Sequence, residues 1–138
     1  MTQFESSVKT IPARTETIFN MLADLNNLEK IRDRIPADKV KDFTFDTDSC
    51  SFTVAPVGPM KISIVEREPH KTIKFGSGNS PVPFHLWIQL LPLSETESKM
   101  KLTVRAELNP FIQKMVSKPL QEGIEKMAEV LAAIPYNG

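Results

Sequence analysis

From residue 38 to residue 108, apolar and polar side chains alternate along the chain, and turn-prone residues interrupt the alternation at short intervals. A period of two is typical of strands that have one face against a core. The pattern predicts about six antiparallel strands, over residues 41–45, 50–54, 60–64, 73–75, 84–93 and 99–108. A further strand is predicted over residues 4–11, with one face formed by Phe4, Ser6, Val8 and Thr10.

Four consecutive strands agree on one apolar face when each is paired across its turn. The expected cross-strand neighbours are Phe45 with Cys50, Phe43 with Phe52, Ile64 with Ile73 and Ile62 with Phe75. A slip of one residue would reverse the face of every side chain, so this agreement predicts the register of the sheet.

The run FHLWIQLL, residues 84–91, departs from the alternation because both of its faces carry large apolar side chains. A turn of three or five residues before strand 99–108 would direct one set inward: Phe84, Leu86, Ile88 and Leu90. A turn of four residues would direct the other set inward: His85, Trp87, Gln89 and Leu91. The first register is favoured, and the second remains open.

In the favoured register, Trp87 lies on the outer face, opposite Arg105, where a cation–π contact is feasible. Together with His85 and Leu91, it would form an exposed aromatic patch. Such patches favour subunit contacts, so a homodimer through this face is the partner hypothesis.

Helical spacing appears at both ends of the strand region. Residues 13–35 carry apolar side chains three to four positions apart, and Asn26 and Asn27 divide them into two predicted short helices, ended by Pro36. Residues 109–135 form a broad apolar stripe and predict the longest helix. Pro119 leaves two alternatives, a kink in one helix or the start of a second one.

Composition limits the classes of function. The chain has 138 residues, a usual size for one domain, and its 17 basic and 17 acidic residues give a net charge of zero. Nucleic acid is therefore not expected as a partner. Cys50 is the single cysteine, the N-terminus lacks a secretory pattern, and no apolar run approaches the roughly 20 residues of a membrane-spanning helix. These features predict a cytoplasmic protein without a membrane span.

Three segments carry a family resemblance: PARTETIFNMLADLNNLEKI at residues 12–31, IVEREPHKTIKF at 64–75 and NPFIQKMVSKPLQEGIEKMAEVLAAI at 109–134. In order and pattern they resemble the START-like (SRPBCC) superfamily, which includes Bet v 1-like carriers, polyketide cyclases and coenzyme Q-binding proteins. The resemblance implies a single α+β domain over residues 1–138 with the helix-grip fold. In that fold a curved antiparallel sheet of about seven strands surrounds a long C-terminal helix, and two short helices follow the first strand.

Few residues offer chemistry on the predicted inward face. Glu66 is the nearest inward acid, His70 falls in a turn, and His85 points outward, so none is expected to act as a catalytic acid or base. The glycines of residues 76–80 lack the third glycine and the lysine of phosphate-binding loops. The histidines and Cys50 have no metal-ligand spacing, so neither a metal nor a cofactor is expected.

An apolar inward face without converging polar groups, together with the resemblance, predicts the binding of a small hydrophobic molecule between the sheet and the terminal helix. The ligand classes considered are polyketides, quinones, lipids and sterol-like compounds. The residues expected to line the cavity are Phe43, Phe52, Val54, Ile62, Ile64, Phe75, Leu86, Ile88, Leu102, Val104, Met115, Leu120, Gly123 and Met127.

Gly123 supports this expectation. Glycine costs a helix about 1 kcal/mol relative to alanine, and this cost is easier to understand if the position leaves room for a ligand or for close contact with a strand. Ser6 and Thr10 could supply hydroxyls that orient the ligand. Two alternatives stay open. One is a polyketide cyclase- or dehydratase-like enzyme, and the other is a protein-interaction module resembling the chaperone activators of the superfamily.

Overall fold

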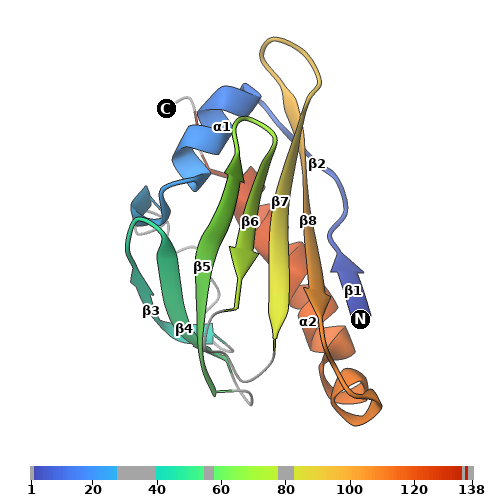
Figure 1. The fold of residues 1–138 in the computed structure, drawn as a ribbon. Coiled ribbons are helices and arrows are strands. Elements are labelled where there is room, and N and C mark those ends of the chain that lie inside the picture. Colours follow the sequence, from blue (N-terminus) through green and yellow to red (C-terminus); the bar gives the residue numbers. More distant parts are fainter. Residues whose placement is uncertain (1, 28–39, 55–57, 78–82, 135, 137–138) are drawn as a thin grey trace.

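The computed structural model describes residues 2–27, 40–54, 58–77, 83–134 and 136. Its strands are β1 (Thr2–Glu5), β2 (Lys9–Ile11), β3 (Val40–Phe45), β4 (Ser49–Val54), β5 (Gly58–Glu68), β6 (Thr72–Gly76), β7 (Phe84–Pro92) and β8 (Ser98–Ala106), and its helices are α1 (Thr15–Leu22) and α2 (Pro110–Ala132). The strands form one antiparallel sheet in the order β1-β8-β7-β6-β5-β4-β3, and β2 also pairs with β8 (Figure 1).

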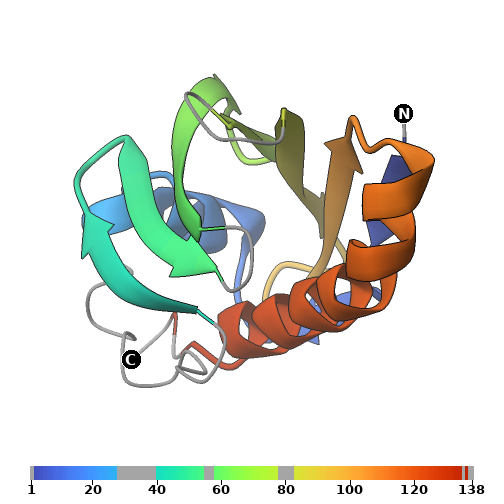
Figure 2. The same ribbon diagram turned by 90° about the horizontal axis from the view of Figure 1, so that it is seen from below.

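The sheet is strongly curved, and α2 runs along its concave side (Figure 2). The helix packs against β1, β2 and β8. Buried apolar side chains of α1, α2 and the sheet form one core between them. This arrangement confirms the predicted α+β helix-grip architecture.

The hairpin of β7 and β8 has the favoured register. Pro92 pairs with Ser98, so the connection has an odd number of residues and even positions pair with even ones: Phe84 with Ala106, Leu86 with Val104, Ile88 with Leu102 and Leu90 with Met100. One detail of the prediction was wrong, because Trp87 lies opposite Thr103 and not Arg105. The turn lies one residue earlier in the chain than expected. The partner of every β7 residue therefore moves by two positions along β8, and each side chain keeps its expected face.

A bulge in β5 corrects the expected pairing of β5 with β6. Ile64 pairs with Phe75 and Arg67 with Ile73, and the register shifts between Ile64 and Glu66. The expected pairs of Ile64 with Ile73 and of Ile62 with Phe75 are therefore wrong. The extra residue reverses the faces beyond it, so Glu66 lies on the outer face opposite Lys74 and Arg67 shares the inner face with Ile73.

The hairpin of β3 and β4 is confirmed at its turn and differs further along. Phe45 pairs with Cys50 as expected, and Asp46 closes the turn by accepting hydrogen bonds from the amide and the hydroxyl of Ser49. The ladder shifts register between Lys41 and Thr44, where Phe43 was expected opposite Phe52. This second bulge interrupts the predicted pair.

The predicted first strand is two strands, because the chain leaves the ladder at Ser6. The amide of Ser6 donates to the carbonyl of Leu102, and the Ser6 hydroxyl accepts from the amide of Leu102 at 3.0 Å. The Ser6 hydroxyl thus accepts the bond that a backbone carbonyl would accept in a regular ladder. Beyond Ser6, odd-numbered side chains point to the face that even-numbered ones occupy before it. Ile11 is consequently buried and Thr10 exposed, contrary to the face expected for Thr10.

The two described helices show where the first helix ends and whether Pro119 divides the last one. α1 ends at Leu22, earlier than the expected break at Asn26 and Asn27, and the second short helix was predicted on residues that lie largely outside those described. α2 is one helix that continues through Pro119. It begins at an Asn109 cap, and it changes direction in its N-terminal half (Figure 2), as a proline within a helix causes.

Candidate functional site

One end of the concave face is sealed by α1. Ile18, Phe19 and Leu22 of α1 are buried, and the helix contacts β7. Beneath them, Ile73 and Met100 are 0% exposed, and Ile88, Leu90 and Leu102 are also buried. We call this the closed end of the sheet.

Inward side chains farther from α1, or nearer the β3 edge, are only half-buried. They are Phe45, Phe52, Ile62, Ile64, Phe84 and Leu86. Parity in the ladders places them on the same face as buried Cys50 and Phe75, yet solvent still reaches them. Water against such side chains costs about 25 cal/mol per Å² of apolar surface. The end of the sheet where β5 and β7 begin, with Phe52, Ile62, Phe84 and Leu86, is therefore an apolar, accessible surface, which we call the open end.

One flank of α2 borders this concave surface. With 3.6 residues per turn, the helix buries Ile124, Ala128 and Leu131 and carries Gly123 and Met127 beside them. A Cβ built on Gly123 would meet nothing within 4 Å, so close approach of a strand does not explain the glycine. Met127 is 37% exposed. Gly123 is exposed as well, so the space beside these two residues is open to solvent.

Polar contacts fasten the opposite flank of α2 to the sheet. Glu125 accepts hydrogen bonds from the amide and the hydroxyl of Ser7, and its carboxylate pairs with Lys9. Gln121 donates to the carbonyl of Glu5 at 2.7 Å. The hydrogen bond from Lys9, followed by those from Ser7, lowers the pKa of Glu125 from 4.5 to about 2. The flank with Gly123 has no such ties among the described residues.

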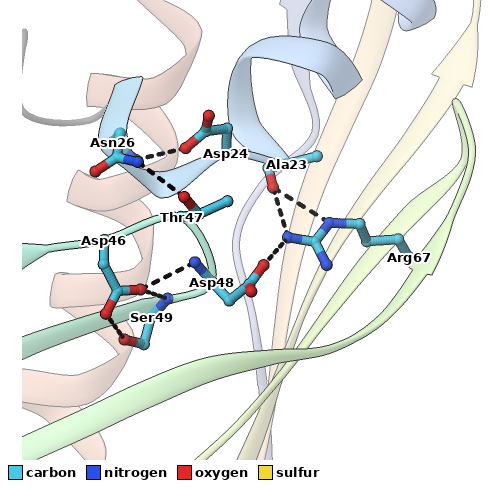
Figure 3. A network of polar contacts seen from close by, with 8 residues as sticks. All are labelled: Ala23, Asp24, Asn26, Asp46, Thr47, Asp48, Ser49 and Arg67. Carbon is cyan, nitrogen blue, oxygen red and sulfur yellow. Dashed lines mark hydrogen bonds and ion pairs between the residues drawn. The ribbon is translucent and has the colours of Figure 1, made fainter.

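A second polar network holds the closed end together (Figure 3). Arg67 donates from Nε and Nη2 to the carbonyl of Ala23, which caps the C-terminus of α1, and its Nη2 also pairs with Asp48 in the β3–β4 turn. The side chain of Asn26 donates to the hydroxyl of Thr47 from the other side. The network joins α1, the β3–β4 turn and β5 into one unit.

The residues considered as acids or bases do not reach the concave face. The β5 bulge turns Glu66 outward, and His85 lies on the outer face, 5.9 Å from the ring of Trp87. His70 sits in the β5–β6 turn at a positive φ of 63° and makes an edge-to-face contact with Phe19. Within the described part of the chain, no three His, Cys, Asp or Glu side chains gather as a metal site.

Sequence reasoning missed a buried tyrosine. The hydroxyl of Tyr136 donates to the carbonyl of Leu131 at 2.6 Å, and burial raises the pKa of Tyr136 above its usual value. The hydroxyl is already bonded at the end of α2, where it holds Tyr136 against the helix. The only signal in the sequence was its position just after the terminal apolar stripe.

The hydroxyls proposed to orient a ligand are also accounted for. Ser6 is engaged with the backbone of Leu102 and Ser7, and Thr10 is exposed on the outer side of β2. Neither lies free on the concave face.

The outer face near Trp87 is polar and charged. The Lys74 ammonium lies 5.4 Å and the Arg105 guanidinium 5.8 Å from the centre of the indole ring. A shallow recess of about 240 Å³ beside the ring is lined by Glu66, Glu68, Thr72, Lys74, Trp87 and Gln89. Charged groups thus surround the ring, and the homodimer contact stays a prediction.

The predicted lining residues fall into several groups. Phe52, Ile62, Ile64 and Leu86 are half-buried on the concave face, whereas Phe75, Ile88, Leu102 and Val104 are buried in the core. Leu120, Gly123 and Met127 lie along α2, with Leu120 packed against the core. Met115 is not brought to them, because its side chain is 54% exposed near the start of α2. The side chains of Phe43 and Val54 lie outside the described part of the structure.

Phe45 and Phe84 join the half-buried group, although neither was among the predicted lining residues. Both had been expected on the apolar face. Parity alone could therefore have found them.

No protein-family model matches the chain, and a search of curated proteins finds no match. Solved structures do match. Norcoclaurine synthase from Thalictrum flavum in complex with dopamine and hydroxybenzaldehyde is 14% identical, with a TM-score of 0.71 over 95% of this chain and 84% of that one. A START superfamily protein from Mycobacterium smegmatis is 12% identical, with a TM-score of 0.63 over 94% of both chains. A Thermus thermophilus protein is 18% identical, with a TM-score of 0.68 over 95% of this chain and 94% of that one. These likenesses establish the START-like, Bet v 1-like fold.

Among the described helices, none is both long and apolar enough to cross a bilayer. The cytoplasmic location stays a prediction.

Proposed function

We propose that the chain binds a small hydrophobic molecule between the concave face of the sheet and α2, with access from the open end. The observation that carries the proposal is the half-burial of inward apolar side chains there, among them Phe52, Phe84 and Leu86. A ligand that covered them would remove apolar surface from water on both partners, at about 25 cal/mol per Å².

The chemistry of the surface supports an apolar ligand. The half-buried inward group consists of phenylalanine, isoleucine and leucine, and the hydroxyls of Ser6 and Tyr136 are bonded to backbone groups. A molecule of the polyketide, quinone, lipid or sterol class fits such a lining better than a charged metabolite. The norcoclaurine synthase complex supports the binding of a small molecule, since a protein of this fold holds two aromatic compounds.

That likeness also favours an enzyme as the second candidate. A cyclase- or dehydratase-like reaction would depend on the shape in which the ligand is held, because Glu66 and His85 lie on the outer face. Turnover of a bound polyketide-like substrate would then persist in Glu66→Gln and His85→Gln variants. Loss of turnover in either variant would contradict this account of the enzyme.

A substitution at Gly123 tests the binding proposal. Leucine at this position meets no atom near its Cβ and improves helix propensity, so Gly123→Leu is expected to fold and to place its side chain in the open space beside Met127, at the border of the proposed site. The probe is the neutral dye N-phenyl-1-naphthylamine, followed by fluorescence, with native mass spectrometry of a lipid and quinone panel alongside. We expect at least about a tenfold weaker dye affinity, equivalent to ~1.4 kcal/mol.

Glu122→Leu is the matched control, because Glu122 is the preceding residue on the same helix, is exposed like Gly123 and points about 100° further round the helix, away from Met127. It adds the same side chain outside the proposed site and is expected to bind the dye as the wild type does. The proposal is wrong if the wild type binds neither the dye nor any compound of the panel. Equal affinity of Gly123→Leu and the wild type would also contradict it.

A further inference from the structure

The first turns of α2 expose apolar side chains. Phe111 is 75% exposed and Met115 is 54% exposed. They are four residues apart, so they lie on the same side of the helix. Lys114 and Lys118 are also exposed and also four apart, and they fall within the same arc of the helix surface. Two apolar side chains and two ammonium groups therefore share one exposed surface, which we call the α2 tip.

The charge of the α2 tip differs from that of the whole chain. Residues 109–120 contain two lysines and no acidic residue, whereas the chain as a whole has a net charge of zero. The acidic residues of α2 begin at Glu122, beyond the tip, and Glu107 precedes the helix. The tip therefore complements a negatively charged surface that can also accept apolar side chains.

The position of the α2 tip relates it to the open end. Figure 1 shows the first turns of α2 at the lower end of the sheet, where β7 begins, and α1 at the upper end. Half-buried Phe84 is the first residue of β7. The exposed tip and the accessible apolar surface thus face the same end of the molecule.

We propose that the α2 tip docks on an anionic lipid bilayer. Phe111 and Met115 enter the interface between headgroups and acyl chains, and Lys114 and Lys118 contact lipid phosphates. A bilayer suits a small protruding tip, because its interface adapts to side chains that offer no broad flat area. Docking would bring the open end close to the bilayer, so that a hydrophobic ligand could pass between them. This last step rests on the proposed function, whereas the docking itself does not.

Vesicle flotation tests the docking. The probes are vesicles of phosphatidylcholine alone and of phosphatidylcholine with about 30% phosphatidylglycerol. The wild type is expected to float with the anionic vesicles and to bind the neutral ones much more weakly. Lys114→Gln with Lys118→Gln should lower the partition coefficient on anionic vesicles by about fivefold for each lysine, about 25-fold together. Phe111→Ser with Met115→Ser should lower it at least about tenfold.

Leu91→Ser with Lys99→Gln is the matched control. These two exposed residues pair with one another near the tip of the β7–β8 hairpin, at the opposite end of the sheet, and their substitution removes one apolar and one basic group. This variant should float as the wild type does. Because all substituted side chains are exposed, unchanged unfolding transitions are expected throughout.

Three outcomes would overturn the docking. They are no flotation of the wild type, an equal loss in the control, and a dimer in sedimentation that Phe111→Ser with Met115→Ser abolishes without any vesicle binding. The third result would assign the tip to self-association. Dye binding in the same preparations separates the two proposals, since retained dye binding without flotation refutes the bilayer alone.

Discussion

Removal of the Ser6 hydroxyl should destabilise the fold, because this hydroxyl satisfies a buried backbone amide. The Leu102 amide donates to it at 3.0 Å, and Leu102 is 1% exposed. In Ser6→Ala the amide loses its partner where water cannot replace it, at a cost of about 1–3 kcal/mol. The second bond of the hydroxyl, to the carbonyl of Ser7, is partly accessible to water and adds little. We expect a loss of about 2 kcal/mol in the free energy of unfolding.

Urea denaturation followed by circular dichroism measures this loss, and a fall in Tm of roughly 5–8 °C should accompany it. Ser94→Ala is the control, since Ser94 is exposed in the β7–β8 turn and should cost less than about 0.5 kcal/mol. Amide exchange resolved by NMR adds a local readout, because the Leu102 amide should exchange faster in the variant. A Ser6→Ala protein as stable as the Ser94→Ala control, with unchanged exchange at Leu102, would refute the reasoning.

Two further predictions concern α2. Gly123→Ala should raise the free energy of unfolding by about 1 kcal/mol in urea denaturation, because alanine favours the helix and its Cβ meets nothing within 4 Å; a loss of stability would mean that the space is filled. The pKa of Glu125 is lowered from 4.5 to about 2, so its contribution to stability is complete above pH 4.5 and is lost as the pH falls toward 2. Unfolding free energies measured across this range should fall less steeply in Glu125→Gln than in the wild type, and parallel curves would contradict the assigned contact with Lys9.

The alternation of the sequence was sufficient to predict the six strands from β3 to β8, the inward set of β7 and the pairing of Phe45 with Cys50. These features follow from local parity and from the number of residues in a turn. The order of elements and the resemblance were sufficient for the helix-grip arrangement. What the sequence could not predict were the breaks in parity at Ser6, between Lys41 and Thr44, and in β5.

A bulge adds one residue to a strand, and the sequence on either side of it still alternates. The alternation therefore does not reveal where the bulge lies. It arises where a curved sheet must bend, which depends on the whole fold. The β5 bulge shows the functional consequence, because it moves Glu66 to the outer face and Arg67 to the inner one. A candidate acid was thereby removed from the concave face, and an arginine was placed at its sealed end.

The sequence was sufficient to predict which face of the sheet carries the candidate site, but not which end of that face remains accessible. Parity assigned both Ile88 and Leu86 to the inner side of β7, yet Ile88 is buried and Leu86 is half-buried. The difference depends on which end α1 covers, and neither residue carries a signal of that cover. The three-dimensional arrangement of α1 therefore decides which inward residues remain accessible.

The two polar networks explain why access from the open end is the more reasonable route for a ligand. At the closed end, Arg67 binds the C-terminus of α1 and the β3–β4 turn together, so that opening there would break several hydrogen bonds at once. Glu125 fastens the flank of α2 that faces β1 and β2. Among the described residues, the flank with Gly123 carries no comparable polar contact to the sheet. Under the proposed function, entry at the open end would leave both networks intact, whereas entry beside α1 would first require the closed end to come apart.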